Sequence, residues 1–193
     1  YNSTIKQAID KWYAGTTLKD NDLIADQIFC NDRSATTSDS GTPGEISGSM
    51  STSTTYYYGA YVRLVTNKSP KLTCTTASDK FTVNTSNGNG ALTYPVGLIT
   101  ADEVAMAGGV FGSANNTYYL YTNKYYWLGS SYDFHGSSAF EFGVNSSGYL
   151  NNYILVYTTS GARPVVSLSS KAKLSGNGTY SNPYTVSWFG CLK

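Results

Sequence analysis

The stretch that decides the fold is residues 127–168, WLGSSYDFHGSSAFEFGVNSSGYLNNYILVYTTSGARPVVSL. Short apolar segments at 127–128, 140–144 and 164–168 alternate with runs of Asn, Ser, Tyr, Gly and Asp. Because successive side chains of a β-strand point to opposite faces, one strand can hold a rigid core on one side and polar side chains on the other. The pattern predicts strands over 139–145, 150–157 and 163–169, with turns at Ser147-Gly148 and Ser160-Gly161.

The large apolar side chains of this stretch are the expected framework. Burial of each contributes roughly 1.5 to 3 kcal/mol to folding. The framework residues that we expect are Trp127, Phe140, Phe142, Val144, Val165 and Leu168.

Upstream of this stretch, two short helices are predicted. Over residues 3–15, Ser3 is a suitable N-cap, apolar residues recur at helical spacing, and Gly15 ends the pattern. The second helix begins at Thr100, which forms a capping box with Glu103, and a glycine pair at 108–109 ends it.

The other upstream segments are predicted as strands and loops. Residues 23–29 and the aromatic segment YYYGAYVRLV (56–65) are predicted to be extended. Between them, residues 34–55 contain almost nothing to bury and are expected to form a long exposed loop. A length of 193 residues suits one core, so we expect a single α+β domain over 1–193, with two short helices, twisted antiparallel sheets and long loops.

The composition excludes some partners. Charged residues make up only 13% of the chain, with 13 Lys and Arg against 12 Asp and Glu, so a basic surface for nucleic acid is not expected. No run approaches the roughly 18 apolar residues of a membrane span. The 18 tyrosines among many Ser, Asn and Gly residues resemble the composition of binding surfaces.

Three cysteines are present, and two of them stand at the ends of predicted core segments. Cys30 follows LIADQIF and Cys74 ends PKLTC, so we predict a disulfide between them, with two buried free thiols as the alternative. Cys191 is then left unpaired. No Cys or His lies at metal-ligand spacing from any of the three, so a zinc site is not expected.

Catalytic patterns are weak in this sequence. His135 is the only histidine, in SSYDFHGSS beside Asp133, but a nucleophile elbow is absent and we interpret it as a loop histidine. KDNDLIAD, with Asp20, Asp22 and Asp26, resembles the start of a calcium loop but lacks its glycine and distal glutamate. We therefore expect no metal, no cofactor and no catalysis.

Two charged segments are interpreted structurally. Asp32 and Arg33 in CNDRS are expected to form an internal ion pair or to hold a turn in place. Arg163, at the start of a predicted core strand, is expected to tie down a neighbouring loop.

Four phrases in order, FCNDRS, LTYPVGLITADEVAMAGGVFG, NNTYYLYTNKYYWLGSS and GARPVVSLSS followed by SGNGTYSNPYTV, resemble the C-terminal domain of a family of Gram-positive bacterial surface proteins. That family is similar to the C-type-lectin fold of the formylglycine-generating-enzyme type, as used by the variable proteins of diversity-generating retroelements. The resemblance implies a ligand face between the phrases at 127–130 and 161–166. The contact residues that it implies are Trp127, Tyr132, Asp133, His135, Tyr149, Asn151, Asn152, Tyr153 and Tyr157.

The chain departs from the wider fold in two respects. It lacks the Glu-Pro-Asn calcium signature of animal lectins and the paired catalytic cysteines of the formylglycine enzyme. Neither calcium-dependent sugar binding nor that oxidation is therefore implied.

The leading prediction is an extracellular or cell-surface domain for ligand binding or adhesion, which presents a variable Tyr-, Asn- and Ser-rich face to a protein or glycan on another cell or host surface. The alternative is a structural subunit that self-assembles, such as a pilin-like filament. A hydrolase or oxidoreductase ranks third, because the chain has one histidine and an unpaired Cys191.

Overall fold

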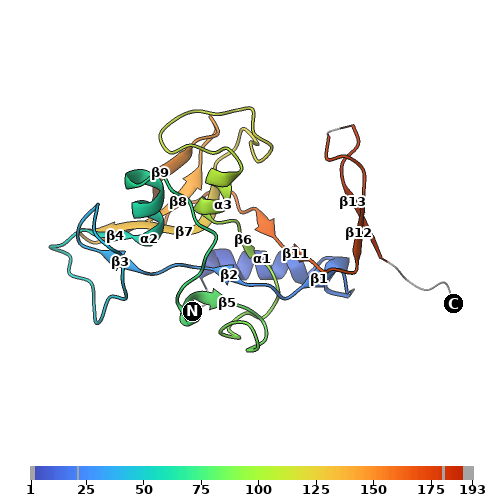
Figure 1. The fold of residues 1–193 in the computed structure, drawn as a ribbon, viewed down its shortest axis with the longest axis horizontal. Helices are drawn as coiled ribbons and strands as arrows, with labels where there is room; N and C mark the ends of the chain where they lie inside the picture. The colour runs from blue at the N-terminus through green and yellow to red at the C-terminus, as the bar shows by residue number, and fades with distance from the viewer. Residues whose placement is uncertain (1–2, 21, 180, 189–193) are drawn as a thin grey trace.

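The computed structural model describes residues 3–20, 22–179 and 181–188, and for residues 151–153 and 188 it describes the backbone alone. It shows a mixed α and β structure in which strands predominate and helices are short (Figure 1). The helical segments are α1 (Thr4–Ala14), η1 (Thr17–Asp20), α2 (Gly59–Tyr61), η2 (Val62–Thr66), η3 (Ala77–Asp79) and α3 (Ala101–Met106).

The strands form one larger sheet and several short pairs. Within the described residues they are β1 (Ile24–Ala25), β2 (Phe29–Cys30), β3 (Ala35–Thr36), β4 (Tyr56–Tyr58), β5 (Lys80–Phe81), β6 (Gly97–Leu98), β7 (Tyr126–His135), β8 (Ser138–Val144), β9 (Leu150–Leu155), β10 (Pro164–Val165), β11 (Ser167–Leu168), β12 (Ala172–Ser175) and β13 (Thr185–Trp188). The larger sheet has five antiparallel strands in the order β3-β4-β7-β8-β9. The shorter pairs β1-β11, β2-β5, β6-β10 and β12-β13 are antiparallel as well.

The main core lies against one face of the larger sheet. The strands β7, β8 and β9 contribute its largest side chains, as the apolar segments of the sequence predict, and α2 and α3 pack on them. Among its buried members are Ala60, Leu64, Val104, Tyr126, Leu128, Phe140, Phe142, Val144 and Leu150. Phe140, Phe142, Val144 and Trp127 are buried as expected, whereas Leu168 is exposed because its short strand pairs only with β1 at the margin of the molecule.

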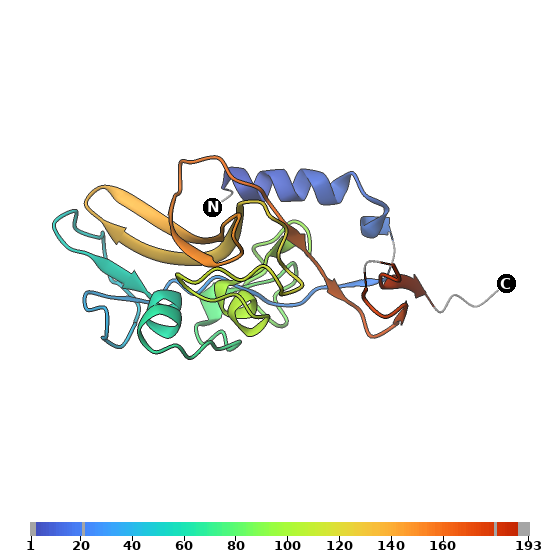
Figure 2. The same cartoon turned by 90° about the horizontal axis from the view of Figure 1, so that it is seen from above.

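Helix α1 belongs to a second, smaller cluster and lies along one side of the molecule (Figure 2). Ser3 accepts a hydrogen bond from the Lys6 backbone, and Gly15 ends the helix, as predicted. Ile9 and Tyr13 pack on Val96, while Trp12 is largely exposed.

The start of α3 also confirms its sequence signal. The Thr100 side chain accepts from the Glu103 backbone, and the Glu103 carboxylate accepts from the Thr100 backbone, which is the predicted capping box. The helix ends at Met106, with Ala107 as its C-cap, just before the two predicted glycines. Local signals fixed this element because its caps use only neighbouring residues.

The strand predicted over 56–65 is wrong beyond Tyr58. The chain forms α2 at Gly59–Tyr61 and continues as a π-helical turn at Val62–Thr66. Ala60, Tyr61, Leu64 and Val65 contact the main core, and this spacing matches a helical face. Burial on the sheet therefore overrides the strand propensity of aromatic and β-branched residues.

The disulfide between Cys30 and Cys74 is present, with Cα atoms 5.6 Å apart, as predicted. It joins β2 to the segment that precedes η3, across 44 residues of sequence. Cys191 lies outside the described residues.

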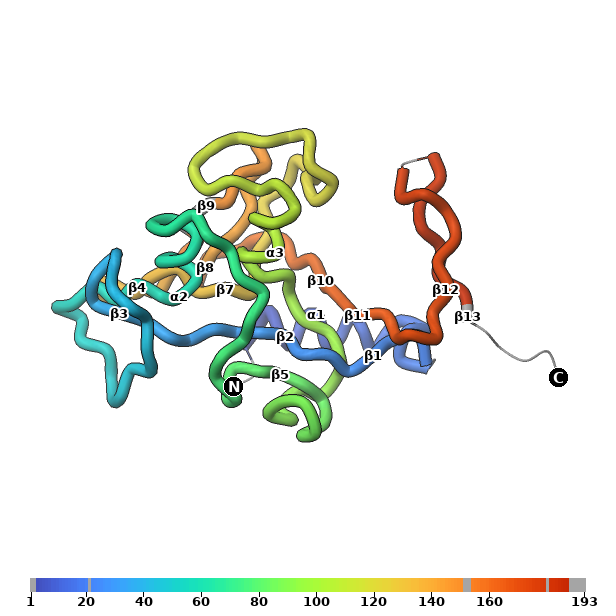
Figure 3. The backbone as a smooth tube through the Cα atoms, in the orientation of Figure 1, coloured from blue at the N-terminus to red at the C-terminus, as the bar shows by residue number. Residues whose placement is uncertain are grey.

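Long irregular segments surround this framework (Figure 3). Residues 34–55 are mostly exposed loop apart from β3, as expected. Residues 107–125 fold over the β8-β9 turn, where the Asn115 amide donates to Ser147 and the Leu150 amide donates to Val110. Arg163 ties this loop down, as predicted, by donating from Nη1 to the Leu120 carbonyl at 2.6 Å.

The hairpin of β12 and β13 stands apart from the rest of the molecule (Figure 1). The chain reaches it through β11 and a short link, in which the Ser169 amide donates to Leu23. Among the described residues, no helix is long and apolar enough to cross a membrane.

Candidate functional site

Strand β7 carries three of the predicted contact residues, and a bulge decides where they point. Its pairing with β8 shifts between Ser131 and Asp133, so that one extra residue is inserted. A bulge of this kind brings two successive side chains toward the same face. As a result, Tyr132 and Asp133 are both buried, although neighbours in a regular strand would face opposite sides.

The Tyr132 ring is part of the core. Its centroid lies 4.9 Å from that of Tyr61 and 4.9 Å from that of Phe142, both edge to face, and it stacks on Phe111 at 6.1 Å. The prediction that Tyr132 lies on an exposed contact face is therefore wrong. Trp127, at the other end of β7, is buried too and acts as framework rather than as a contact residue.

Asp133 and His135 form a pair beside this core. His135 Nδ1 lies 3.2 Å from Asp133 Oδ2, and the imidazole stacks on Phe140 at 4.8 Å. Asp133 is 7% exposed, and its Oδ1 has no hydrogen-bond partner. Burial raises the pKa of Asp133, and the charge and hydrogen bond of His135 act in the opposite direction. The His135 side chain is 42% exposed, at the end of β7 rather than in a loop.

Two tyrosines that the sequence analysis missed complete this group. Tyr57 of β4 lies directly opposite Asp133 in the strand register, so the two side chains share a face. Tyr61 of α2 lies 4.6 Å from Tyr57, measured between ring centroids. Both rings are half-buried. No periodicity in the sequence pairs these two rings, because Tyr57 lies in β4 and Tyr61 in α2, and the change from strand to helix at Gly59 brings them together.

A half-buried glutamate lies on the opposite face of the same strands. Glu141 of β8 accepts a hydrogen bond from Ser131 Oγ at 2.9 Å. Burial raises the pKa of Glu141 to about 7, against the opposing effect of that hydrogen bond. Tyr58 of β4 lies nearby, and burial raises its pKa, with further contributions from the charges of Glu141 and Asp133. A lone glutamate between Phe140 and Phe142 was the sequence signal for this position.

The other predicted contact residues lie at two ends of the sheet. The Val156 amide donates to Ala139, which places Tyr157 beside the start of β8 and at the same end as His135. Tyr157 is 74% exposed. Tyr149 lies at the opposite end, in the β8-β9 turn, where it is half-buried and its amide donates to Asn145 Oδ1. Asn151, Asn152 and Tyr153 belong to β9, and their side chains lie outside the described part.

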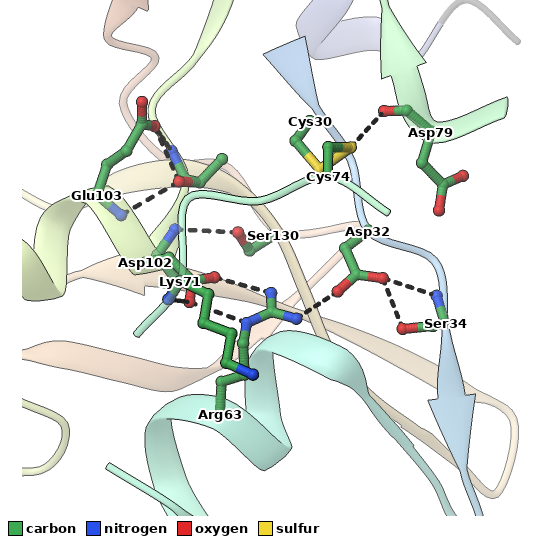
Figure 4. Close-up of polar contacts among 12 residues, drawn as sticks. Cys30, Asp32, Ser34, Arg63, Lys71, Cys74, Asp79, Asp102, Glu103 and Ser130 are labelled. Carbon is green, nitrogen blue, oxygen red and sulfur yellow. Dashed lines mark hydrogen bonds and ion pairs between the residues drawn. A yellow bond between two sulfur atoms is a disulfide. The ribbon is translucent and has the colours of Figure 1, made fainter. Parts of the chain in front are cut away.

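A second charged group holds three distant segments together (Figure 4). Arg63 donates from Nε and Nη2 to the two oxygens of Asp102, at 2.9 and 2.8 Å, and from Nη1 to Asp32 at 2.5 Å. Burial alone would raise the pKa of Asp32, but hydrogen bonds from Ser34 and Arg63 outweigh it and hold this pKa below its usual value.

These contacts show that Asp32 and Arg33 do not pair with each other. Asp32 pairs with Arg63, and Arg33 pairs with Asp79 at 2.6 Å. A pocket of about 380 Å³ includes the charged side chains of this group in its lining, together with the disulfide and apolar side chains such as Phe29 and Leu98. Because the carboxylates neutralise Arg63 with near-ideal geometry, we interpret the group as a structural clamp.

The acidic segment KDNDLIAD has a structural role where it is described. Asp26 accepts from the backbone amides of Val83 and Asn84, both at 2.8 Å, and Asp20 pairs with Lys19. In the parts of the chain that the structure covers, no three His, Cys, Asp or Glu side chains are grouped to hold a metal ion.

Comparisons with protein-family models, with curated proteins and with solved structures gave no match. The geometry described above is therefore the basis for the function proposed below.

Proposed function

We propose that this chain is a non-catalytic ligand-binding domain of the C-type-lectin-like kind, displayed outside the cell, which recognises a protein or glycan. The contact surface is the end of the five-stranded sheet that carries His135 and Tyr157. The observation that carries the proposal is that both side chains are exposed at this end of the sheet, His135 at the end of β7 and Tyr157 in the turn after β9, while β7, β8 and β9 supply the aromatic core. An exposed ring held by a rigid framework binds with little loss of conformational entropy.

The arrangement around His135 supports binding rather than catalysis. A catalytic histidine of the triad type accepts a proton from a nucleophile within hydrogen-bond reach. The hydrogen bond found for His135 among the described residues is that to Asp133, and its ring stacks on Phe140. The exposed edge of the imidazole is then available to a ligand.

The disulfide supports a location outside the cytoplasm. Disulfides persist mainly in oxidising environments, and cytosolic proteins rarely carry structural ones. The bond between Cys30 and Cys74 suits a secreted or surface-displayed protein.

A glycan and protein array tests this function. The purified domain is expected to bind a discrete set of ligands, and His135→Ala and Tyr157→Ala should each weaken that binding while circular dichroism shows that the variant is still folded. Tyr184→Ala, at an exposed tyrosine on the separate β12-β13 hairpin, is the matched control and should bind normally. Equal binding by all three variants would contradict the assigned surface.

A structural subunit of a surface assembly is a second candidate, and the β12-β13 hairpin favours it. Leu174 and Val186 lie opposite each other on one face and are 54% and 41% exposed. A two-stranded hairpin is only marginally stable in water unless its apolar face is covered. Light scattering should then reveal oligomers that Leu174→Asp dissolves and that Ser187→Asp, on the polar face, leaves intact; a monomer at every concentration would exclude this candidate.

A further inference from the structure

We propose that Tyr57, Tyr61 and His135, arranged around the carboxylate of Asp133, form a site for an organic ammonium group. This inference rests on the proposed function and names the chemical class of its ligand.

The two tyrosine rings contact each other, and the pair of His135 and Asp133 lies on the same face of the sheet. Tyr57 is opposite Asp133 in the β4-β7 register, and His135 Nδ1 is 3.2 Å from the Asp133 carboxylate. The Tyr57 and Tyr61 ring centroids are 4.6 Å apart, tilted by 44°. The tyrosine rings are half-buried and the imidazole is 42% exposed, so the group reaches the solvent while its carboxylate lies beneath it.

The charge beneath the rings is negative and only partly compensated. Within the described chain, the ion-pair partner of Asp133 is the His135 imidazole, and its Oδ1 has no hydrogen-bond partner. Burial raises the pKa of Tyr61, and so do the charges of Tyr57, Asp39 and Asp133. A charge held in such a low-dielectric environment acts more strongly on a nearby cation than it would in water.

These features select the ligand class. The faces of aromatic rings carry negative potential and attract cations that shed water easily, above all alkylammonium groups. The Asp133 carboxylate repels anions, and a ring-lined site offers too few oxygen ligands for a hard metal ion. A quaternary ammonium such as choline and a primary ammonium such as a lysine side chain share this chemistry.

Titrations followed by the aromatic NMR signals of the protein test the inference. The probes are choline chloride, butylammonium chloride and neohexyl alcohol, the uncharged carbon analogue of choline, each against sodium chloride at equal ionic strength. At least one of the two ammonium probes should give saturable shifts of the Tyr57 and His135 signals, and neohexyl alcohol should give none. The better ammonium probe then indicates whether the natural ligand is quaternary or primary.

Substitutions test separately what the Tyr57 ring and the Asp133 charge contribute to binding. Tyr57→Leu and Asp133→Asn should each weaken binding about tenfold or more, whereas Tyr57→Phe, which keeps the ring, should bind within about twofold of the parent. Circular dichroism melting shows which variants fold. If Asp133→Asn does not fold, Tyr57→Leu alone tests the inference. Full affinity in a folded Tyr57→Leu variant, or equal binding of neohexyl alcohol, would overturn the inference.

The array experiment distinguishes this failure from failure of the proposed function. If array ligands depend on His135 and Tyr157 while neither ammonium probe binds, the ammonium site is wrong and the ligand-binding function stands. If neither experiment finds a ligand, both are wrong.

Discussion

Glu141 should make the stability of this protein fall as the pH rises. Burial raises the pKa of Glu141 to about 7, from 4.5 for an exposed glutamate, so the folded chain binds an extra proton between these values. A carboxyl whose pKa is higher in the folded state destabilises that state when it ionises. The penalty is absent at low pH, grows between about pH 4.5 and pH 7, and is complete above pH 7.

The pKa difference sets the size of the effect. A pKa difference of about 2.5, at about 1.4 kcal/mol for a difference of one, gives an upper bound of about 3.5 kcal/mol. Because the Glu141 residue is half-buried rather than buried, we expect about 2 kcal/mol. Glu141→Gln keeps a carbonyl acceptor for Ser131 and cannot ionise, so it should be more stable than the parent by about that amount at high pH only.

Urea denaturation of both proteins at about pH 4 and about pH 8, with the disulfide intact, measures this difference. Other titrating groups such as Asp133 contribute equally to parent and variant and cancel. Glu45→Gln, at an exposed glutamate, is the matched control and should change the unfolding free energy equally at both pH values. A stability difference between parent and Glu141→Gln that does not depend on pH would refute the reasoning.

Three further predictions concern the framework and the contact surface. Reducing the bond between Cys30 and Cys74 should lower the unfolding free energy by about 4 kcal/mol, the loop-closure value for a loop of this length, measured by urea denaturation with and without reductant; an unchanged midpoint would contradict it. Arg63→Met leaves the buried Asp102 and the half-buried Asp32 without their partner and should cost about 3 to 5 kcal/mol, seen as a lower melting temperature, whereas a loss below about 1 kcal/mol would mean that the clamp is dispensable. Tyr132→Ala should cost about 3 to 5 kcal/mol and Tyr157→Ala less than about 0.5 kcal/mol in the same assay, and the reverse order would show that the buried and exposed rings are misassigned.

The contact face shows where sequence reasoning failed. A regular alternation places Tyr132 and Asp133 on opposite sides, and the resemblance placed both on the ligand face, yet both are buried. The bulge between Ser131 and Asp133 exists only in the pairing of β7 with β8. A single strand sequence carries no record of the register of its partner.

The Asp32, Arg63 and Asp102 clamp was equally hidden. Arg63 is 31 residues from Asp32 and 39 residues from Asp102, and nothing in the local sequence distinguishes these side chains from solvated charges. They meet because the chain after Tyr58 becomes helical and packs beside α3, which the strand propensity of 56–65 concealed.

The sequence by itself determined the elements whose causes are local. The caps at Ser3 and Thr100, the exposed loop at 34–55 and the apolar framework of β8 follow from neighbouring residues, and even the bond between Cys30 and Cys74 followed from their places at the ends of core segments. The tertiary structure alone decided which tyrosines are buried, which carboxylates find a cation and which rings gather around Asp133. Those outcomes depend on contacts between residues far apart in the chain, and the free energy of such contacts is fixed only when strand register and helix packing are set together.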